Sequence, residues 1–142
     1  MIPPTSSKSV LILCTGNSAR SQMAEGLLRH EAGDRFQVHS AGIEPSRVRP
    51  ESIAVMLEIG IDISNHRSKS IDEFAGQEFD YVITVCDNAR QSFPVFPGSG
   101  RYIHWSIDDP AAAQGSDEER KTIFRRVRDT LGTRIHSFVE DN

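Results

Sequence analysis

Cys14, Arg20 and Ser21 form the spacing Cys-x5-Arg-Ser, in which a nucleophile and a permanent cation flank five small residues. The five are Thr15, Gly16, Asn17, Ser18 and Ala19. An apolar run at residues 10–13 precedes Cys14 and a helical pattern follows Ser21, so the motif joins a buried strand to a helix N-terminus. Backbone N–H groups at such a turn converge on one point, where the helix dipole also favours negative charge. The pattern therefore predicts a cradle for a tetrahedral oxyanion, with the nucleophile built into it.

Each part of the motif has a predicted role. Arg20 offers a planar fork of donors that matches two oxygens of a phosphate or an arsenate. The same N–H groups and guanidinium stabilise a thiolate, so we expect Cys14 to be ionised near neutral pH. Ser21 can donate a hydrogen bond to that thiolate or to a departing group. A lone cysteine after a strand is usually a small buried hydrophobe, but the spacing and the strand-loop-helix context together favour catalysis.

Length and composition exclude several other kinds of protein. The chain has 142 residues, enough for one domain, and we expect residues 1–8 to form a flexible tail and residues 9–142 a single catalytic domain. A net charge of −4 argues against binding to nucleic acid or an anionic membrane, so an anion site must be local. No stretch is typical of a membrane helix or a signal peptide, and we expect a cytoplasmic protein. The 2 cysteines and 5 histidines lack the spacing of metal ligands, so no metal is predicted.

The elements that must position the motif alternate between strand and helix. Strands are predicted at residues 10–13, 36–40, 81–85 and 101–105, and helices after Ser21, from Pro50 and from the capping box Ser116 and Glu119. This alternation predicts an α/β fold with one four-stranded parallel sheet, in the order 2-1-3-4, and helices on both faces. Ligands of such sheets bind at the carboxyl ends of the strands. Cys14 and Cys86, which end the first and third strands, are therefore expected at one site.

Two further candidates follow predicted strands. Asp108, Asp109 and Pro110 come after the fourth strand, and a thiolate that attacks an oxyanion needs an acid to protonate the leaving oxygen. Pro110 restricts the residue before it to extended geometry, which favours Asp109 over Asp108, although Asp-Asp-Pro can also be a simple turn. Cys86 is either a buried thiol at a strand end or a resolving thiol that attacks Cys14 once it carries an oxyanion.

Several segments together resemble the low-molecular-weight tyrosine phosphatase superfamily and, within it, the arsenate reductase branch. They are residues 14–26, Ser-Ala-Gly at residues 40–42, residues 60–66, and Asp109 with Pro110. The resemblance implies that Cys14 attacks arsenate, that Arg20 and the loop hold the oxyanion, and that Asp109 protonates the leaving hydroxyl. Three features favour a reductase: Gln22 after the Arg-Ser pair, Ala111 and Ala112 where phosphatases carry aromatic residues, and the Val-Cys-Asp-Asn-Ala context of Cys86.

The resemblance also implies an external thiol reductant and no tightly bound cofactor. Thioredoxin-coupled reductases have a third cysteine seven residues beyond the second, where this chain has Phe93, so a three-cysteine relay cannot operate. Either Cys86 closes a disulfide with Cys14 that a partner reduces, or a small thiol attacks the Cys14 adduct directly. The candidate reductants are glutathione with glutaredoxin, mycothiol with mycoredoxin, and thioredoxin.

A cation site is the second point at which the chain departs from the resemblance. Some of the reductases build a potassium site from residues that match Asn17, Glu25 and Ser40, together with an acidic residue. Lys69 stands at that fourth position here. Its ammonium can replace the cation, so we expect no bound potassium.

Two other functions fit part of the pattern. A phosphatase acting on small or protein phosphomonoesters shares Cys14, Arg20 and Asp109 and has no need of Cys86, and residual phosphatase activity can accompany a reductase. A non-catalytic module that binds oxyanions or senses redox state would not need Asp109. An Asp109→Asn change that left turnover untouched would support that third interpretation.

Overall fold

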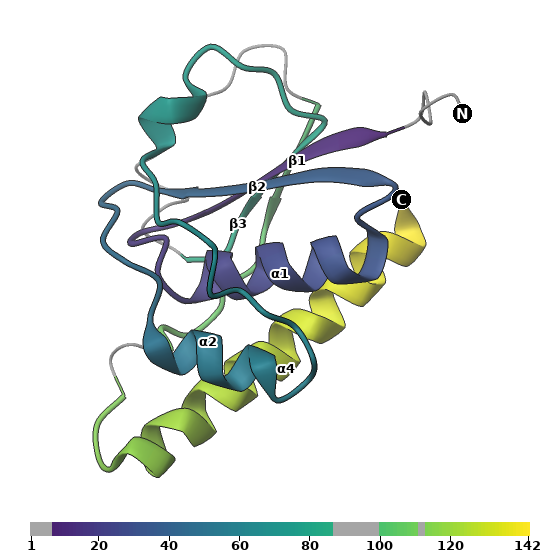
Figure 1. Cartoon of the computed structure of the whole chain (residues 1–142). Helices are drawn as coiled ribbons and strands as arrows, with labels where there is room; N and C mark the ends of the chain where they lie inside the picture. The colour runs from purple at the N-terminus through teal and green to yellow at the C-terminus, as the bar shows by residue number, and fades with distance from the viewer. Residues whose placement is uncertain (1–6, 87–99, 111–112) are drawn as a thin grey trace.

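A parallel sheet of four strands forms the centre of the protein (Figure 1). The computed structural model describes residues 7–86, 100–110 and 113–142. The strands are β1 (Lys8–Cys14), β2 (Phe36–Gly42), β3 (Tyr81–Thr84) and β4 (Arg101–His104). Their order is β2-β1-β3-β4, which confirms the predicted topology. The apolar residues of β1 are buried, as expected of a strand with a neighbour on each side and elements on both faces.

Three α-helices lie on one face of the sheet (Figure 1). They are α1 (Arg20–Ala32), α2 (Pro50–Leu57) and α4 (Asp117–Asp141). Pro50 stands in the first turn of α2, and the capping box of Ser116 and Glu119 begins α4, both as predicted. The apolar stripe of α4 is buried against α1 and α2, so the helix closes this layer of the core.

The opposite face is covered by the segment between α2 and β3, which contains the 3-10 helix η1 (Ile71–Phe74). Phe74 and Phe79 pack against His39 of β2, with ring centroids 5.4 and 6.2 Å from the imidazole. The sequence predicts helices on both faces. Among the described residues, this second face carries the 3-10 helix and no α-helix.

The strand register brings the ends of three strands to one edge. Cys14 pairs with Gly42 of β2, and Leu13 pairs with Thr84 of β3. The N–H of Val85 then donates to the carbonyl of Leu13 at 2.9 Å, so Cys86 follows directly at the same carboxyl edge as Cys14. Residues 1–6 of the predicted tail, Phe93, Ala111 and Ala112 lie outside the described residues. No helix in the described part of the chain is long and apolar enough to cross a membrane.

Candidate active site

The loop from Cys14 to Arg20 is held in shape by the segment that follows β2. Its carbonyl groups accept hydrogen bonds from backbone N–H groups of that segment at 2.8 to 3.3 Å. The pairs are Ile43 with Cys14, Glu44 with Thr15, Ser46 with Gly16 and Arg49 with Ser18. Because the carbonyls turn outward to these partners, N–H groups of the loop are left to face the cradle. Asn17 adopts φ of 48°, a left-handed conformation that asparagine tolerates better than most residues.

The thiol of Cys14 lies inside this loop with donors at its sulfur. Cys14 is only 2% exposed. The backbone N–H of Asn17 donates to the Cys14 Sγ atom at 3.2 Å, and the Ser21 Oγ atom lies 2.8 Å from the same sulfur. A thiolate has no hydrogen to give, so Ser21 is the donor whenever Cys14 is ionised. This arrangement is the one expected of a stabilised nucleophile.

The side chain of Asn17 ties the loop to three other segments. Its Nδ2 atom donates to the hydroxyls of Ser21 and Ser40 at 2.7 and 3.0 Å. Its Oδ1 atom accepts from Gln22 Nε2 and from the backbone N–H of Lys69, both at 2.9 Å. The Lys69 N–H can only donate, which fixes the orientation of the amide. With the Ser21 oxygen accepting from Asn17, the Ser21 hydrogen is directed to Cys14.

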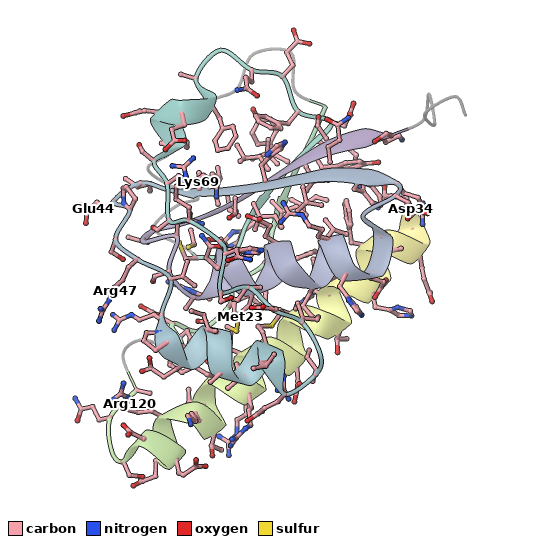
Figure 2. All side chains as sticks on the ribbon, in the orientation of Figure 1. Met23, Asp34, Glu44, Arg47, Lys69 and Arg120 are labelled. Carbon is pink, nitrogen blue, oxygen red and sulfur yellow. The ribbon has the colours of Figure 1, made fainter. Side chains whose placement is uncertain are left out.

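A buried acid, Glu25, lies behind this network. It accepts a hydrogen bond from Ser40 at 2.5 Å and pairs with Arg29 at 2.8 Å. The Lys69 ammonium lies 3.8 Å from the Glu25 carboxylate, near the carboxyl end of β2 (Figure 2). Burial lowers the pKa of Lys69, and the Glu25 charge acts in the opposite direction. Lys69 therefore stands where its charge can replace a cation, and the absence of bound potassium remains a prediction.

Arg20 and Asp109 meet at the open side of the loop. The Arg20 side chain is largely buried, and its Nη1 atom donates to the carbonyl of Ile107 at 3.0 Å. Its Nη2 atom lies 3.7 Å from the Asp109 Oδ2 atom. The Asp109 side chain is half exposed at 49%, so it can receive protons from water and reach a group bound in the loop. Asp108 is exposed and forms no such pair with Arg20.

Cys86 lies against the second residue of the loop. Its Sγ atom is 3.2 Å from the Thr15 Oγ1 atom, and both cysteines are buried, with no disulfide bond between them. The strand ends thus bring Cys14 and Cys86 to one edge of the sheet, as the predicted order requires. Thr15, Gly16, Ser18 and Ala19 complete the loop around the nucleophile.

Comparison with known proteins agrees with this geometry. The family model of the low molecular weight phosphotyrosine protein phosphatases matches residues 9–141. The chain belongs to this family. Within the family it is 49% identical over 133 residues to an arsenate reductase of Halalkalibacterium halodurans, in an alignment that covers 94% of this chain and 96% of that protein.

Solved structures of the family show the same architecture. An arsenate reductase in the phosphate binding state has 34% sequence identity and a TM-score of 0.78, with 94% of this chain and 98% of that chain covered. A thioredoxin-dependent arsenate reductase of Corynebacterium glutamicum has 27% identity and a TM-score of 0.73, with 97% of this chain and 63% of that chain covered. The family membership and the reductase relatives agree with the resemblance carried by the Cys14 motif.

The family resemblance pointed to Gln22 and Ser40, but no sequence pattern revealed the hydrogen bonds through which they shape the loop. Gln22, Ser40 and His66 belong to the polar network around Asn17 and Glu25, and the Gln22 Oε1 atom accepts a hydrogen bond from His66 Nδ1 at 3.0 Å. Arg49 fixes the loop through its backbone. No local signal marks most of these contacts, because they join segments more than 20 residues apart. The only sequence feature that indicates such a network is the number of polar residues in the predicted helix that follows the motif.

Proposed function

We propose that the protein reduces arsenate to arsenite, with Cys14 as the nucleophile. The observation that carries the proposal is that one sheet edge combines a buried thiol with donors at its sulfur, the Arg20 and Asp109 pair, and a second thiol, Cys86. Arsenate reductases are also among the relatives that align over nearly the whole chain.

In the first step the Cys14 thiolate attacks arsenic and displaces one oxygen. Arg20 and the N–H groups of residues 15–21 hold the remaining oxygens, whose negative charge matches that site. Asp109 gives a proton to the departing oxygen, which leaves as water, and a sulfur–arsenic bond is formed. No electrons have been exchanged at this stage, so arsenic is still pentavalent.

In the second step another thiolate attacks the Cys14 sulfur. A disulfide bond forms, the sulfur–arsenic bond breaks, and its electron pair stays on arsenic, which leaves as trivalent arsenite. Two thiols have then been oxidised and one arsenic reduced, so the electrons balance. Cys86, beside Thr15, is one candidate for the attacking thiol, and an external small thiol is the other.

An outside reductant must then restore the thiols. With 2 cysteines in the chain, one turnover leaves at most one disulfide, and no further cysteine remains to pass it on. Glutathione with glutaredoxin, mycothiol with mycoredoxin, and thioredoxin are the candidate donors. These donors work in the cytoplasm, where we place the reaction.

The test is arsenite production by the purified protein with each of the three reductant systems, run beside hydrolysis of an aryl phosphate. Cys14→Ser should abolish both activities, and Asp109→Asn should slow both. If Cys86 is the attacking thiol, Cys86→Ser should slow arsenate reduction while aryl phosphate hydrolysis continues. If an external thiol attacks Cys14 directly, Cys86→Ser should leave both activities in place.

Two results would contradict the proposal, and a third would exclude Cys86 as the attacking thiol. Aryl phosphate hydrolysis without arsenite production under any reductant would assign a phosphatase. Equal loss of both activities in Cys86→Ser would make Cys86 a structural thiol. Turnover by Cys14→Ser would remove the nucleophile assignment.

A further inference from the structure

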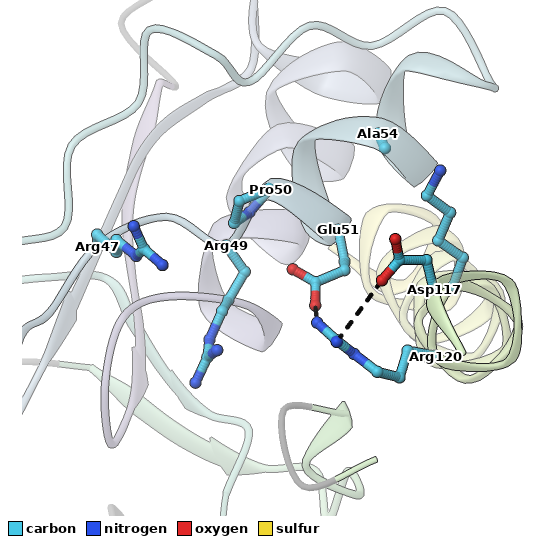
Figure 3. Close-up of a pocket in the computed structure, with 8 residues that line it drawn as sticks. Arg47, Arg49, Pro50, Glu51, Ala54, Asp117 and Arg120 are labelled. Carbon is cyan, nitrogen blue, oxygen red and sulfur yellow. Dashed lines mark hydrogen bonds and ion pairs between the residues drawn. The ribbon is translucent and has the colours of Figure 1, made fainter. Parts of the chain in front are cut away.

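A charged pocket lies where the segment after β2 approaches the beginning of α4 (Figure 3). Its volume is about 410 Å³, within the range of small-molecule sites. Four cationic side chains and two carboxylates line it: Arg47, Arg49, Arg120, Lys121, Glu51 and Asp117. The whole chain carries a net charge of −4, so this excess of positive charge is local.

Two of the cations are already committed to protein partners. Arg120 forms ion pairs with Glu51 and, at 3.8 Å, with Asp117. Lys121 lies 3.9 Å from Glu118. Burial opposes ionisation of Glu51, but the hydrogen bond from Arg120 and the charges of Arg120 and Arg49 outweigh it and lower the pKa of this carboxyl. The pocket therefore contains a stable carboxylate beside its cations.

The other two cationic side chains, Arg47 and Arg49, have hydrogen-bond donors available for a ligand. The guanidinium groups of Arg47 and Arg49 make no hydrogen bond to any of the residues that the structure describes. Arg47 is exposed, and Figure 2 shows it on the same edge of the molecule as Arg120. These two guanidinium groups can bind anionic groups of a ligand, and the carboxylate in the same pocket can bind a cationic group. The pocket therefore suits a ligand that carries both positive and negative charge.

The pocket is joined to the oxyanion loop. The Arg49 N–H donates to the carbonyl of Ser18 at 2.9 Å, and the Ser46 N–H donates to the carbonyl of Gly16 at 3.2 Å. The segment that carries Arg47 and Arg49 is thus bonded to the loop that holds Cys14. A ligand bound in the pocket therefore contacts the segment that holds the oxyanion loop in shape.

We propose that this pocket binds the reductant, as a small zwitterionic peptide thiol of the glutathione type. The inference rests on the proposed function and names the thiol that it requires. Arg47 and Arg49 receive the two carboxylates of the peptide, and Glu51 or Asp117 receives its ammonium group. Pro50 and Ala54 provide apolar contact for its methylene groups.

The bound thiol then takes part in the second step of the reaction. Its thiolate attacks the Cys14 sulfur, a mixed disulfide forms, and the electron pair of the sulfur–arsenic bond leaves with arsenite. A second molecule of the same thiol, or a redoxin, reduces the mixed disulfide. A protein reductant is the less favoured occupant, because the opposite charges are gathered within one cavity instead of spread over a flat surface.

The experiment measures steady-state arsenite production with glutathione and, separately, with the uncharged thiol 2-mercaptoethanol. In Arg47→Ala and Arg49→Gln, the KM for glutathione should rise about tenfold, as expected for the loss of one charge-assisted hydrogen bond. The KM for arsenate should change much less. The ratio of kcat/KM for glutathione to kcat/KM for 2-mercaptoethanol should fall by the same factor as the KM for glutathione rises. Arg134→Ala, which removes an exposed arginine far along α4, is the matched control.

A second experiment uses S-methylglutathione, which binds like glutathione but cannot react. In steady-state assays of the wild-type protein it should compete with glutathione but not with arsenate. Its affinity by calorimetry should fall in Arg47→Ala and stay the same in Arg134→Ala.

The outcomes separate this inference from the proposed function. If no thiol or redoxin supports arsenite production, the proposed function fails. If arsenite forms but both arginine variants keep the wild-type KM for glutathione, only the pocket assignment fails. It also fails if the KM for arsenate rises as much as that for glutathione, because the pocket would then serve oxyanion entry, or if only a protein reductant supports turnover.

Discussion

Asn17→Ala tests the idea that one buried amide holds the oxyanion loop together. Asn17 is fully buried, and its side chain makes four hydrogen bonds. The partners are the hydroxyls of Ser21 and Ser40, the Gln22 amide and the Lys69 backbone N–H. Alanine removes all four and must also adopt the positive φ of this position. We expect loss of both stability and activity.

The expected loss of unfolding free energy depends on which hydrogen bonds each partner of Asn17 keeps in the variant. Ser21 still bonds Cys14, Ser40 still bonds Glu25, and Gln22 still bonds backbone carbonyls, so each of these losses is worth about 0.5–1 kcal/mol. The Lys69 N–H has no other acceptor among the described residues, and a buried donor left unsatisfied costs about 1–3 kcal/mol. Strain at the left-handed φ adds about 1 kcal/mol. The variant should therefore lose about 3.5–7 kcal/mol of unfolding free energy.

Urea unfolding followed by circular dichroism measures this loss, and Asn65→Ala is the matched control. Asn65 is exposed, so its replacement should change the unfolding free energy by less than about 0.5 kcal/mol. The kcat for arsenate should also fall in Asn17→Ala, because the direction of the Ser21 hydroxyl is no longer fixed. A loss of stability below about 1 kcal/mol would refute the hydrogen-bond reasoning.

Three further predictions concern other parts of the fold. Gly42→Ala places a methyl 2.7 Å from the Thr15 carbonyl, so we expect about 1–3 kcal/mol of destabilisation and a deformed loop, measured by urea unfolding and turnover. Gly132→Ala meets nothing within 4 Å in the middle of α4 and should instead stabilise by about 0.5–1 kcal/mol; destabilisation would contradict this account. The hydrogen bond from Arg125 lowers the pKa of Glu58 to about 2, so its stabilisation is complete above the usual pKa of 4.5 and disappears as the pH falls through 2. The difference in unfolding free energy between wild type and Glu58→Gln should thus shrink between about pH 5 and 2, and a constant difference would argue against it.

The order of the sheet could be predicted because strong local signals agreed with each other. An uninterrupted apolar run marks β1, Pro50 and the Ser116 capping box mark two helix starts, and alternating elements leave few topologies. Strand boundaries differ by one or two residues. β3 and β4 end one residue before the predicted residues 85 and 105, β2 continues two residues beyond residue 40, and β1 spans Lys8–Cys14 where residues 10–13 are predicted. The segment that covers the second face of the sheet could not be predicted from a sequence pattern, because η1 is too short to show helical periodicity.

The site could be predicted where its parts are adjacent in sequence or lie at the ends of neighbouring strands. Cys14, Arg20 and Ser21 lie within one loop, and the strand order places Cys86 at the same sheet edge. The resemblance places Lys69 and Asn17 at one cation site, but no sequence pattern predicts the hydrogen bond between them, which spans 52 residues. Arg47 and Arg49 belong to none of the sequence motifs, and the structure places them in a pocket with residues of α4.

The outward carbonyls of the oxyanion loop bear on protein engineering. The eight residues from Cys14 to Ser21 do not determine the conformation of the loop by themselves. Residues 43–49 donate hydrogen bonds to their carbonyls, and Gly42 lies against their backbone. Grafted alone onto another strand–helix junction, the same peptide would lose the contacts that turn its N–H groups inward. The transferable unit is a pair of segments, and the second segment contributes none of the residues that define the motif.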